Sequence, residues 1–214
     1  MAPLVVNEIF HSIQGESSSM GRPCVFVRLT YCNLRCTWCD TAYAFEEGTP
    51  MEMEDILRDV DRHGCKLVEV TGGEPLMQEG VHELMTSLAD RGYEVLLETG
   101  GSLDISKVDA RVRRIVDFKC PSSGMLKKNL WTNVGHLRST DEVKFVIGDR
   151  GDFDWSVRAI DEQELLRRCP VLMSPVFGVL EPVTLAGWIL ESRLPVRFQL
   201  QMHKVIWDPA MRGV

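Results

Sequence analysis

The chain has 214 residues, of which 44% are hydrophobic and 26% are charged, so a disordered or coiled-coil protein is excluded. Its 31 acidic and 24 basic residues give a net charge of −7 at pH 7 without a basic block, so we expect no nucleic-acid binding. No apolar run is long enough to span a bilayer and the first residues carry no export signal, so we expect no membrane association and a cytoplasmic location.

Short apolar runs alternate with amphipathic stretches along the chain. The segment 5–16 comes before the first run, and we expect it to fold back over the strand ends. The apolar runs predict strands at residues 25–29, 67–70, 95–97, 115–118, 143–147, 171–173 and 196–200.

Four helices are expected between these strands. The sequence 49–52 (TPME) is a capping box with proline at the first helical position, and Gly64 suits the end of that helix. A second apolar stripe covers residues 81–88 and is followed by Gly92. Two further helices are expected at residues 155–168 and 182–190.

Strands that alternate with helices indicate βα units on a parallel sheet, the pattern of the α/β class. Six or seven strands are too few for an eight-fold barrel, so we predict an incomplete, partial TIM-type (β/α)6-like barrel with an N-terminal extension. Since the sequence contains no repeat or linker, one domain over residues 1–214 is expected. Ligands of such folds bind at the carboxyl ends of the strands.

The cysteines are the unusual feature of the composition. Seven of them, in a chain without an export signal, argue against a disulfide framework and for metal binding or reactive thiols. Cys32, Cys36 and Cys39 follow the first strand, with three and two residues between them. Three thiolates in one loop suit a soft metal or an iron–sulfur cluster, and on a 4Fe-4S cluster they leave one iron open.

A structural zinc site is the alternative for this loop, although such a site normally needs four protein ligands. The nearest candidates for a fourth ligand are Cys24, Cys65, His11 and His63. The cysteines that match no ligand spacing are Cys24, Cys65, Cys120 and Cys169, and we expect them to be small core residues.

The cysteine motif, with Trp38 before its last cysteine, resembles that of the radical S-adenosylmethionine superfamily. The sequence 71–75 (TGGEP) at the end of the second strand resembles the second motif of that superfamily, whereas the glycines alone would only indicate a turn. The resemblance implies that the open iron binds S-adenosylmethionine and that one electron cleaves it to a 5′-deoxyadenosyl radical. The protein positions and shields this chemistry.

Further stretches resemble one family of this superfamily, the 7-carboxy-7-deazaguanine synthases. They are residues 7–10 (NEIF), 12–16 (SIQGE), 27–29 (VRL), 39–41 (CDT) and 198–204, which end in Gln-x-His-Lys. The resemblance implies a carbon–nitrogen lyase that converts 6-carboxy-5,6,7,8-tetrahydropterin to 7-carboxy-7-deazaguanine with release of ammonia. This is a Mg2+-dependent ring contraction of queuosine and 7-deazapurine biosynthesis. The family also implies a homodimer and an electron donor such as a flavodoxin or ferredoxin.

The same resemblance assigns the cofactor site. Cys32, Cys36 and Cys39 are implied to bind the 4Fe-4S cluster, and Gly73 lets the backbone approach the methionyl amine. Thr41 is implied to bind Mg2+, which prefers oxygen ligands, whereas the residue type alone favours a helix or turn cap. The residues implied to contact S-adenosylmethionine are Trp38, Cys39, Asp40, Gly73, Asp117, Phe118, Lys119, Ser174 and Pro175. A buried anchor is the alternative for Trp38, and a solvated charge for Lys119 and Lys144.

The substrate site follows from the resemblance in the same way. The residues implied to contact the pterin are Ile13, Gln14, Gly15, Arg28 and Thr71. Arg28 suits the substrate carboxylate because a guanidinium pairs with it bidentately, and a surface charge is the alternative. Glu16 is the candidate catalytic residue for proton transfer, with ordinary hydrogen bonding to substrate as the alternative. Glu98 lies in a sequence that departs from the family pattern, and His203 is either a site residue or structural.

Two other functions remain open from the sequence. A glycyl-radical-enzyme activating protein shares the cysteine motif and a short barrel, but it would bind a protein substrate and would not need Thr41. A zinc-stabilised binding module without turnover would use the same cysteines for structure alone.

Overall fold

The computed structural model describes residues 3–214, which form a nine-stranded sheet in the order β3-β1-β2-β4-β5-β6-β7-β8-β9. The strands are β1 Leu4–Ile13, β2 Pro23–Leu29, β3 Thr49–Met51, β4 Leu67–Gly72, β5 Glu94–Thr99, β6 Arg113–Asp117, β7 Glu142–Ile147, β8 Val171–Pro175 and β9 Arg197–Phe198. Strands β2, β4, β5, β6, β7, β8 and β9 follow one another in this order, and each is parallel to the next. Strands β1 and β3 lie at one edge, where β1 is antiparallel to both β2 and β3. This arrangement confirms the predicted partial TIM-type α/β barrel.

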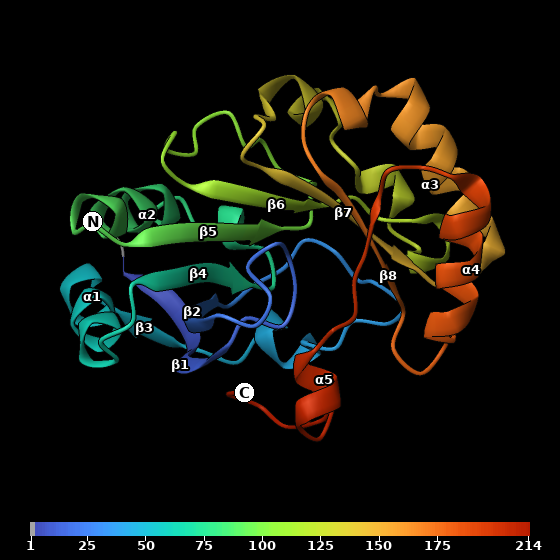
Figure 1. Cartoon of the computed structure of the whole chain (residues 1–214). Helices are drawn as coiled ribbons and strands as arrows, with labels where there is room; N and C mark the ends of the chain where they lie inside the picture. The colour runs from blue at the N-terminus through green and yellow to red at the C-terminus, as the bar shows by residue number, and fades with distance from the viewer. Residues whose placement is uncertain (1–2) are drawn as a thin grey trace.

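Helices cover the outer side of this sheet (Figure 1). They are α1 Met53–Arg62, α2 Val81–Asp90, α3 Arg150–Glu162 and α4 Pro182–Ser192, whereas the short α5 His203–Ile206 lies apart from them near the C-terminus. Figure 1 shows α1 and α2 beside the first strands and α3 and α4 beside the last ones. The connection from β6 to β7 contains short 3-10 helices at Pro121–Ser123, Leu126–Lys128 and Trp131–His136. The first of these 3-10 helices lies against the cysteine loop, where Thr37 N–H donates to Ser123 O (3.1 Å).

The alternation of side chains along the strands separates two apolar layers. Val68 and Val70 of β4 belong to the main core with residues of α1 and α2 such as Ile56 and Leu84. The other face of β4 starts with Leu67, which packs in a smaller cluster with Cys24, Phe26, Leu96 and Ile115. Because these residues lie in the amino-terminal halves of their strands, they form the floor of the barrel, and the polar cavity opens above them.

The predicted capping box is wrong. Residues Thr49–Met51 form β3, which pairs with Leu4–Val6 of β1. Helix α1 starts only at Met53, and the side chain of Glu52, the residue before it, makes no capping hydrogen bond. The backbone hydrogen bonds of this segment are made to β1, which is distant in the sequence. A local sequence motif cannot predict such a pairing.

The placement of segment 5–16 over the strand ends is also wrong. Most of it forms β1, whose Ile13 pairs with Pro23 at the start of β2. The chain then turns across the amino-terminal side of the barrel, where Ser18 N–H donates to Glu142 of β7 (3.0 Å). Residues 14–16 therefore enter the barrel from the amino-terminal ends of the strands rather than from their carboxyl ends.

Other boundaries moved by a few residues. Helix α3 begins at Arg150 instead of 155 because Asp149 accepts a bond from Asp152 N–H (2.8 Å) and caps the helix. The last strand is short, and the Gln-x-His-Lys sequence ends in α5 rather than in a strand. Gly64 and Gly92 follow α1 and α2 with positive φ of 64° and 76°, as predicted. Among residues 3–214, no helix has the length and apolarity needed to cross a membrane.

Candidate active site

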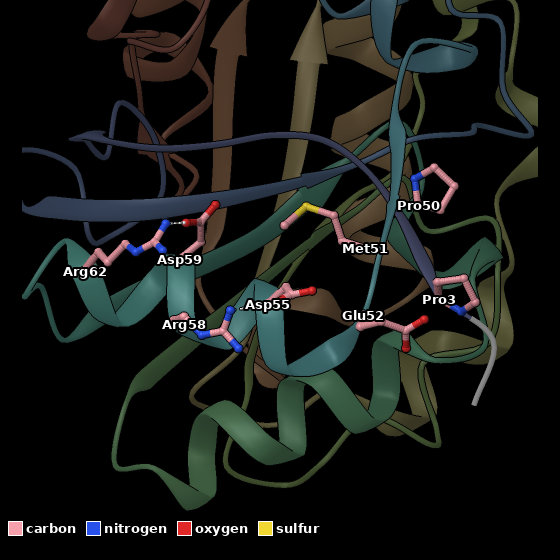
Figure 2. A pocket seen from close by; sticks show the side chains of 8 residues that line it. All are labelled: Pro3, Pro50, Met51, Glu52, Asp55, Arg58, Asp59 and Arg62. Carbon is pink, nitrogen blue, oxygen red and sulfur yellow. Dashed lines mark hydrogen bonds and ion pairs between the residues drawn. The ribbon is translucent and has the colours of Figure 1, made fainter.

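A cavity of about 660 Å³ opens at the carboxyl ends of the parallel strands. All predicted site residues except Phe118, Ser174 and Pro175 line it. A second cavity of about 410 Å³ lies between α1 and the edge strand β3 (Figure 2). Two arginines at its rim are paired with Asp55 and Asp59, and its lining within residues 3–214 includes no predicted site residue. The larger cavity is therefore the candidate site.

The cysteine loop forms one wall of this cavity. Cys32, Cys36 and Cys39 are unpaired, half-buried thiols that line the same space. Burial raises the pKa of Cys32 and Cys36, so iron has to displace a proton from each of them. In the described part of the chain, no three Cys, His, Asp or Glu side chains converge closely enough to hold a metal ion. The donor set fits an iron–sulfur cluster, which three thiolates of one loop can hold.

The candidates for a fourth zinc ligand lie elsewhere. Cys24 is fully buried in the floor cluster, and Cys65 donates to Pro23 O (3.2 Å) at the start of β2. His11 stacks on His63 with ring centroids 5.9 Å apart, beside the same end of the sheet. The described residues therefore place none of the four beside the loop, which does not favour a closed zinc site. Cys120 and Cys169 are buried, as expected for core residues.

The glycine-rich turn after β4 is built against the cysteine loop. Gly73 N–H donates to Leu29 O (3.1 Å) and Glu74 N–H donates to Tyr31 O (2.7 Å). A Cβ on Gly73 would overlap Tyr31 O and lie 2.8 Å from Cys32 Cβ. The turn thus needs glycine at this position because the loop backbone passes directly over it.

The glutamate of the same motif has a structural role. Glu74 is fully buried, and its carboxylate accepts bonds from Leu76 N–H (3.1 Å), Thr99 Oγ1 (2.9 Å) and Gly100 N–H (2.8 Å). It thereby ties the end of β4 to the end of β5. The sequence identifies the motif only through its resemblance, and the structure supplies a physical reason for its glutamate.

Lys144 of β7 is the centre of the charges inside the barrel. Its Nζ donates to Glu16 Oε2 (2.7 Å) and to Glu98, and lies 3.6 Å from Asp117 Oδ2. Burial alone would lower the pKa of Lys144, but Glu16, Glu98 and Asp117 together raise it well above its usual value. Lys119 adds a second ion pair with Asp117 (2.9 Å). Neither lysine is a solvated surface charge.

The carboxylates around Lys144 differ in the direction in which their pKa values are shifted. Burial would raise the pKa of Glu16, but Lys144 and a bond from Gln201 lower it below its usual value, so Glu16 is ionised. Burial raises the pKa of Glu98, and it raises the pKa of Glu69 well above the usual range. Glu16 is therefore a hydrogen-bond acceptor at neutral pH and can take a proton rather than give one.

Gln14 is held within the protein instead of projecting freely. Its side chain is 2% exposed; Nε2 donates to Glu69, and Oε1 accepts from Glu16 N–H. Its backbone pairs with Arg22 O and Gly21 N–H at 2.8 Å each. A pterin bound by the side-chain amide of Gln14 would have to compete with Glu69 and Glu16 N–H for the same hydrogen bonds.

Arg28 points into the cavity from the end of β2. Its Nε donates to Glu8 Oε1 (2.7 Å), and that oxygen also accepts from the Tyr43 hydroxyl (3.1 Å). Within residues 3–214 no acceptor bonds its two terminal nitrogens, and the side chain is 14% exposed. Arg28 therefore faces the cavity rather than the surface, and only Nε of its guanidinium is hydrogen-bonded within residues 3–214.

The sequence left open whether Thr41 is a Mg2+ ligand or a cap, and whether Trp38 is a ligand contact or a buried anchor. Thr41 precedes the 3-10 helix Ala42–Phe45, but its side chain makes no capping bond, and Oγ1 lies 3.8 Å from Cys39 Sγ. Thr41 lines the cavity, and this long contact with sulfur leaves its hydroxyl oxygen able to bind a ligand there. Trp38 lines the cavity while its ring edge packs against Gly148.

One buried polar atom of the cavity supports a ligand beside the loop. Asp117 Oδ1 is buried without a hydrogen-bond partner among the described residues, as expected of a group that a polar ligand completes. Ser174 Oγ is also buried and unpartnered within residues 3–214, but Ser174 does not line the cavity. Phe118 is fully buried and stacks on Trp131 with centroids 4.6 Å apart. Its side chain belongs to the core, so only its backbone is available to S-adenosylmethionine.

The C-terminal segment covers the remaining side of the cavity. Figure 1 shows it running from α4 down to α5. Lys204 of α5 donates to Asp40 (2.6 Å), and His203 packs against Gly15, where an added Cβ would overlap its Nδ1. Lys204 lowers the pKa of Asp40 although burial would raise it. Residues Pro209 to Val214 also line the cavity.

Glu69 was not identified from the sequence as a site residue, and the sequence left open the contact of Glu98, the role of His203 and whether residues 207–214 close over the substrate or fray. The available signal was a glutamate within two otherwise apolar strand sequences, LVEV and VLLE. A charge in a buried strand indicates a polar interior because burial is costly for an unpaired charge.

The chain is similar to known proteins over its whole length. The sequence model of the Radical SAM superfamily matches residues 27–163. The chain is 48% identical to the 7-carboxy-7-deazaguanine synthase of Chlorobaculum tepidum, covering 100% of this chain and 98% of that protein. It is 42% identical to the 7-carboxy-7-deazaguanine synthase of Koribacter versatilis, covering 98% and 99%.

Two crystal structures share the fold. One is QueE from Escherichia coli, with a TM-score of 0.78 and 21% identity over 94% of this chain and 95% of that chain. The other is Streptococcus suis SuiB bound to S-adenosylmethionine, with a TM-score of 0.56 and 12% identity over 80% and 45%.

The contact of Gly73 with the cysteine loop predicts the effect of a side chain there. Gly73→Ala should displace the loop and lower the iron and sulfide bound after anaerobic reconstitution to a small fraction of the wild-type content. Gly187→Ala in α4 is the matched control, because a Cβ there meets no atom within 4 Å. Wild-type iron content in Gly73→Ala would show that the turn does not position the loop.

Proposed function

The chain belongs to the 7-carboxy-7-deazaguanine synthase family of the Radical SAM superfamily, and we propose that it converts 6-carboxy-5,6,7,8-tetrahydropterin to 7-carboxy-7-deazaguanine. The pterin loses ammonia in this ring contraction. The observation that carries the proposal is one cavity that combines the three-cysteine loop, the glycine-rich turn and the half-used guanidinium of Arg28. As a member of this family the protein is a radical S-adenosylmethionine lyase.

The similarity over the full chain favours this function over the two alternatives. A glycyl-radical-enzyme activating protein would need a surface for a protein substrate, whereas the cavity here is lined on one side by residues Pro209 to Val214. A zinc-stabilised module would need a fourth ligand that the described residues do not bring to the loop.

Cys32, Cys36 and Cys39 would hold the 4Fe-4S cluster, with Gly73 next to them. When bound there, the cluster and S-adenosylmethionine supply the 5′-deoxyadenosyl radical that starts the reaction. Asp117 would offer its unpaired polar atom to S-adenosylmethionine. The role of the protein would be to hold these groups next to the substrate and to exclude water.

Arg28 would bind the substrate carboxylate through its two terminal nitrogens, while Glu8 fixes its Nε. Glu16, ionised and held by Lys144, would accept a proton or hydrogen bond from the pterin ring. Thr41 would offer its hydroxyl oxygen to Mg2+, whose remaining ligands would come from substrate and water. We further propose a homodimer and a flavodoxin or ferredoxin as electron donor.

A single assay tests the proposed function. Reconstituted, reduced protein is incubated anaerobically with S-adenosylmethionine, Mg2+ and 6-carboxy-5,6,7,8-tetrahydropterin, and the products are separated by chromatography and identified by mass. We expect 7-carboxy-7-deazaguanine and 5′-deoxyadenosine. Formation of 5′-deoxyadenosine without the deazaguanine would contradict the proposed substrate while leaving the superfamily chemistry intact.

Removing the guanidinium should weaken substrate binding specifically. Arg28→Ala should raise KM by about tenfold or more, because a charged hydrogen bond contributes roughly 1.5–3 kcal/mol, and it should leave the iron content unchanged. Arg22→Ala is the control, since Arg22 is exposed and pairs with Glu94 outside the cavity. An unchanged KM in steady-state kinetics would remove Arg28 from the substrate site.

Chelating Mg2+ should lower turnover without bleaching the cluster. Thr41→Ala should raise the Mg2+ concentration needed for half-maximal rate, and Thr41→Ser, which keeps the hydroxyl, should restore it. Rates would be measured against added Mg2+ with absorbance monitored in parallel. Equal Mg2+ dependence in all three proteins would mean that Thr41 does not bind the ion.

A further inference from the structure

Glu69 of β4 is a buried carboxyl group without a cation partner. The residue is 2% exposed and borders the large cavity from inside the barrel. Lys144 pairs with Glu16 and Glu98, but within residues 3–214 no cation forms an ion pair with Glu69. Because burying a carboxyl group is costly unless hydrogen bonds satisfy its oxygens, the partners of these two oxygens indicate what the group is for.

A chain of hydrogen bonds fixes the orientation of this carboxyl group. The backbone N–H of Glu16 donates to Gln14 Oε1, which leaves Gln14 Nε2 to donate to Glu69 Oε2. The chain starts from a backbone N–H, which can only donate, so every later group in it has a defined role. The other oxygen, Glu69 Oε1, accepts no hydrogen bond from the described residues. It is therefore the atom that a ligand in the cavity can bind.

A flat apolar wall adjoins Glu69 in the same cavity. Phe26 of β2 is opposite Glu69 in the register of the two parallel strands. Its ring stacks on that of Phe10 in β1, with the centroids 4.8 Å apart and the planes at 11°, and both residues line the cavity. An apolar surface beside one unpaired polar atom suits a planar heterocyclic ring that is recognised at its edge.

Arg28 lies closer than Glu69 to the carboxyl ends of the strands. It is opposite Thr71, which follows Glu69 by two residues on β4. The strand spacing and the rise per residue place the Cα atoms of Arg28 and Glu69 roughly 8 Å apart. A pterin carries its carboxylate at one end of the bicyclic ring and its 2-amino group at the other. With the carboxylate on Arg28, the amino group is therefore directed toward Glu69.

We propose that Glu69 selects the pterin ring by accepting a hydrogen bond from its 2-amino group. This inference rests on the proposed function, because it takes a carboxylated pterin as the substrate. Burial and the nearby Glu98 raise the pKa of Glu69, which supports this role. A carboxyl group whose ionisation is disfavoured suits a neutral donor such as a ring amino group better than a cation.

Replacing this carboxyl group by an amide converts the free acceptor into a donor. In Glu69→Gln, Gln14 Nε2 still needs an oxygen, so the amide oxygen takes that place and the NH2 group faces the cavity. The two probes are pterin-6-carboxylate, which carries the 2-amino group, and lumazine-6-carboxylate, which carries a carbonyl oxygen at that position. Both rings are fully oxidised, so their binding is measured without turnover.

Affinities for the cluster-loaded protein with S-adenosylmethionine are measured by calorimetric titration. Wild-type protein should bind pterin-6-carboxylate about tenfold or more tightly than lumazine-6-carboxylate, because the lumazine offers Glu69 no donor at this position. In Glu69→Gln this preference should reverse, since the amide NH2 can donate to the lumazine oxygen. Equal affinities in the wild-type protein, which needs no variant, or an unchanged preference in Glu69→Gln would overturn the proposal.

Glu142→Gln is the matched control. Glu142 of β7 is likewise 2% exposed, and its carboxylate accepts from Ser18 N–H (3.0 Å) away from the cavity lining. This variant should keep the wild-type iron content and the wild-type preference between the two probes. If both variants lost the preference to the same extent, the effect would come from removing a buried carboxyl group in general, and the role of Glu69 would be refuted.

Turnover separates this inference from the proposed function. Glu69→Gln should raise KM for 6-carboxy-5,6,7,8-tetrahydropterin by about tenfold and keep the iron content of the wild type. A wild-type protein that forms the deazaguanine but does not discriminate between the probes would contradict the role of Glu69 alone. A wild-type protein that forms no deazaguanine and binds neither probe would contradict the proposed function and this inference with it.

Discussion

The ammonium group of Lys144 connects parts of the chain that are far apart in the sequence. It binds Glu16 from the turn after β1, Glu98 from β5 and lies beside Asp117 of β6. Three buried carboxylates would repel one another without it, and breaking a buried ion pair typically costs about 3–5 kcal/mol. The position of the turn 14–16 beneath the cavity, and with it the candidate proton acceptor, therefore depends on one lysine side chain.

The polar groups of the cavity are divided between two sides. One side holds Lys144 with its carboxylates, where burial and the neighbouring Glu98 raise the pKa of Glu69 well above its usual value and so disfavour a further negative charge. The other side holds Arg28, whose terminal nitrogens are free for an anion. A substrate with a carboxylate and a neutral ring fits this division, because its charge pairs with Arg28 while its ring faces the Lys144 group.

The sequence predicted the parts of this structure that depend on local pattern. Apolar runs located the parallel strands, and the cysteine spacing and the glycine-rich turn located the two motifs that the fold places in contact. The roles of residues such as Arg28 came from the family resemblance, and the structure adds a physical reason in its unused nitrogens.

Long-range pairing explains what local sequence could not predict. The capping-box sequence 49–52 forms a strand because β1 offers it an edge, and β1 itself runs antiparallel to β2. The amide of Gln14 is occupied by Glu69, a partner 55 positions away.

The most direct measurement for the whole account is a crystal structure of the cluster-loaded protein with S-adenosylmethionine and 6-carboxy-5,6,7,8-tetrahydropterin, determined without oxygen. We expect the cluster on Cys32, Cys36 and Cys39, the pterin carboxylate on the terminal nitrogens of Arg28, and the ring next to Glu16. A pterin carboxylate bound away from Arg28, or a cluster held by any other residues, would contradict the account.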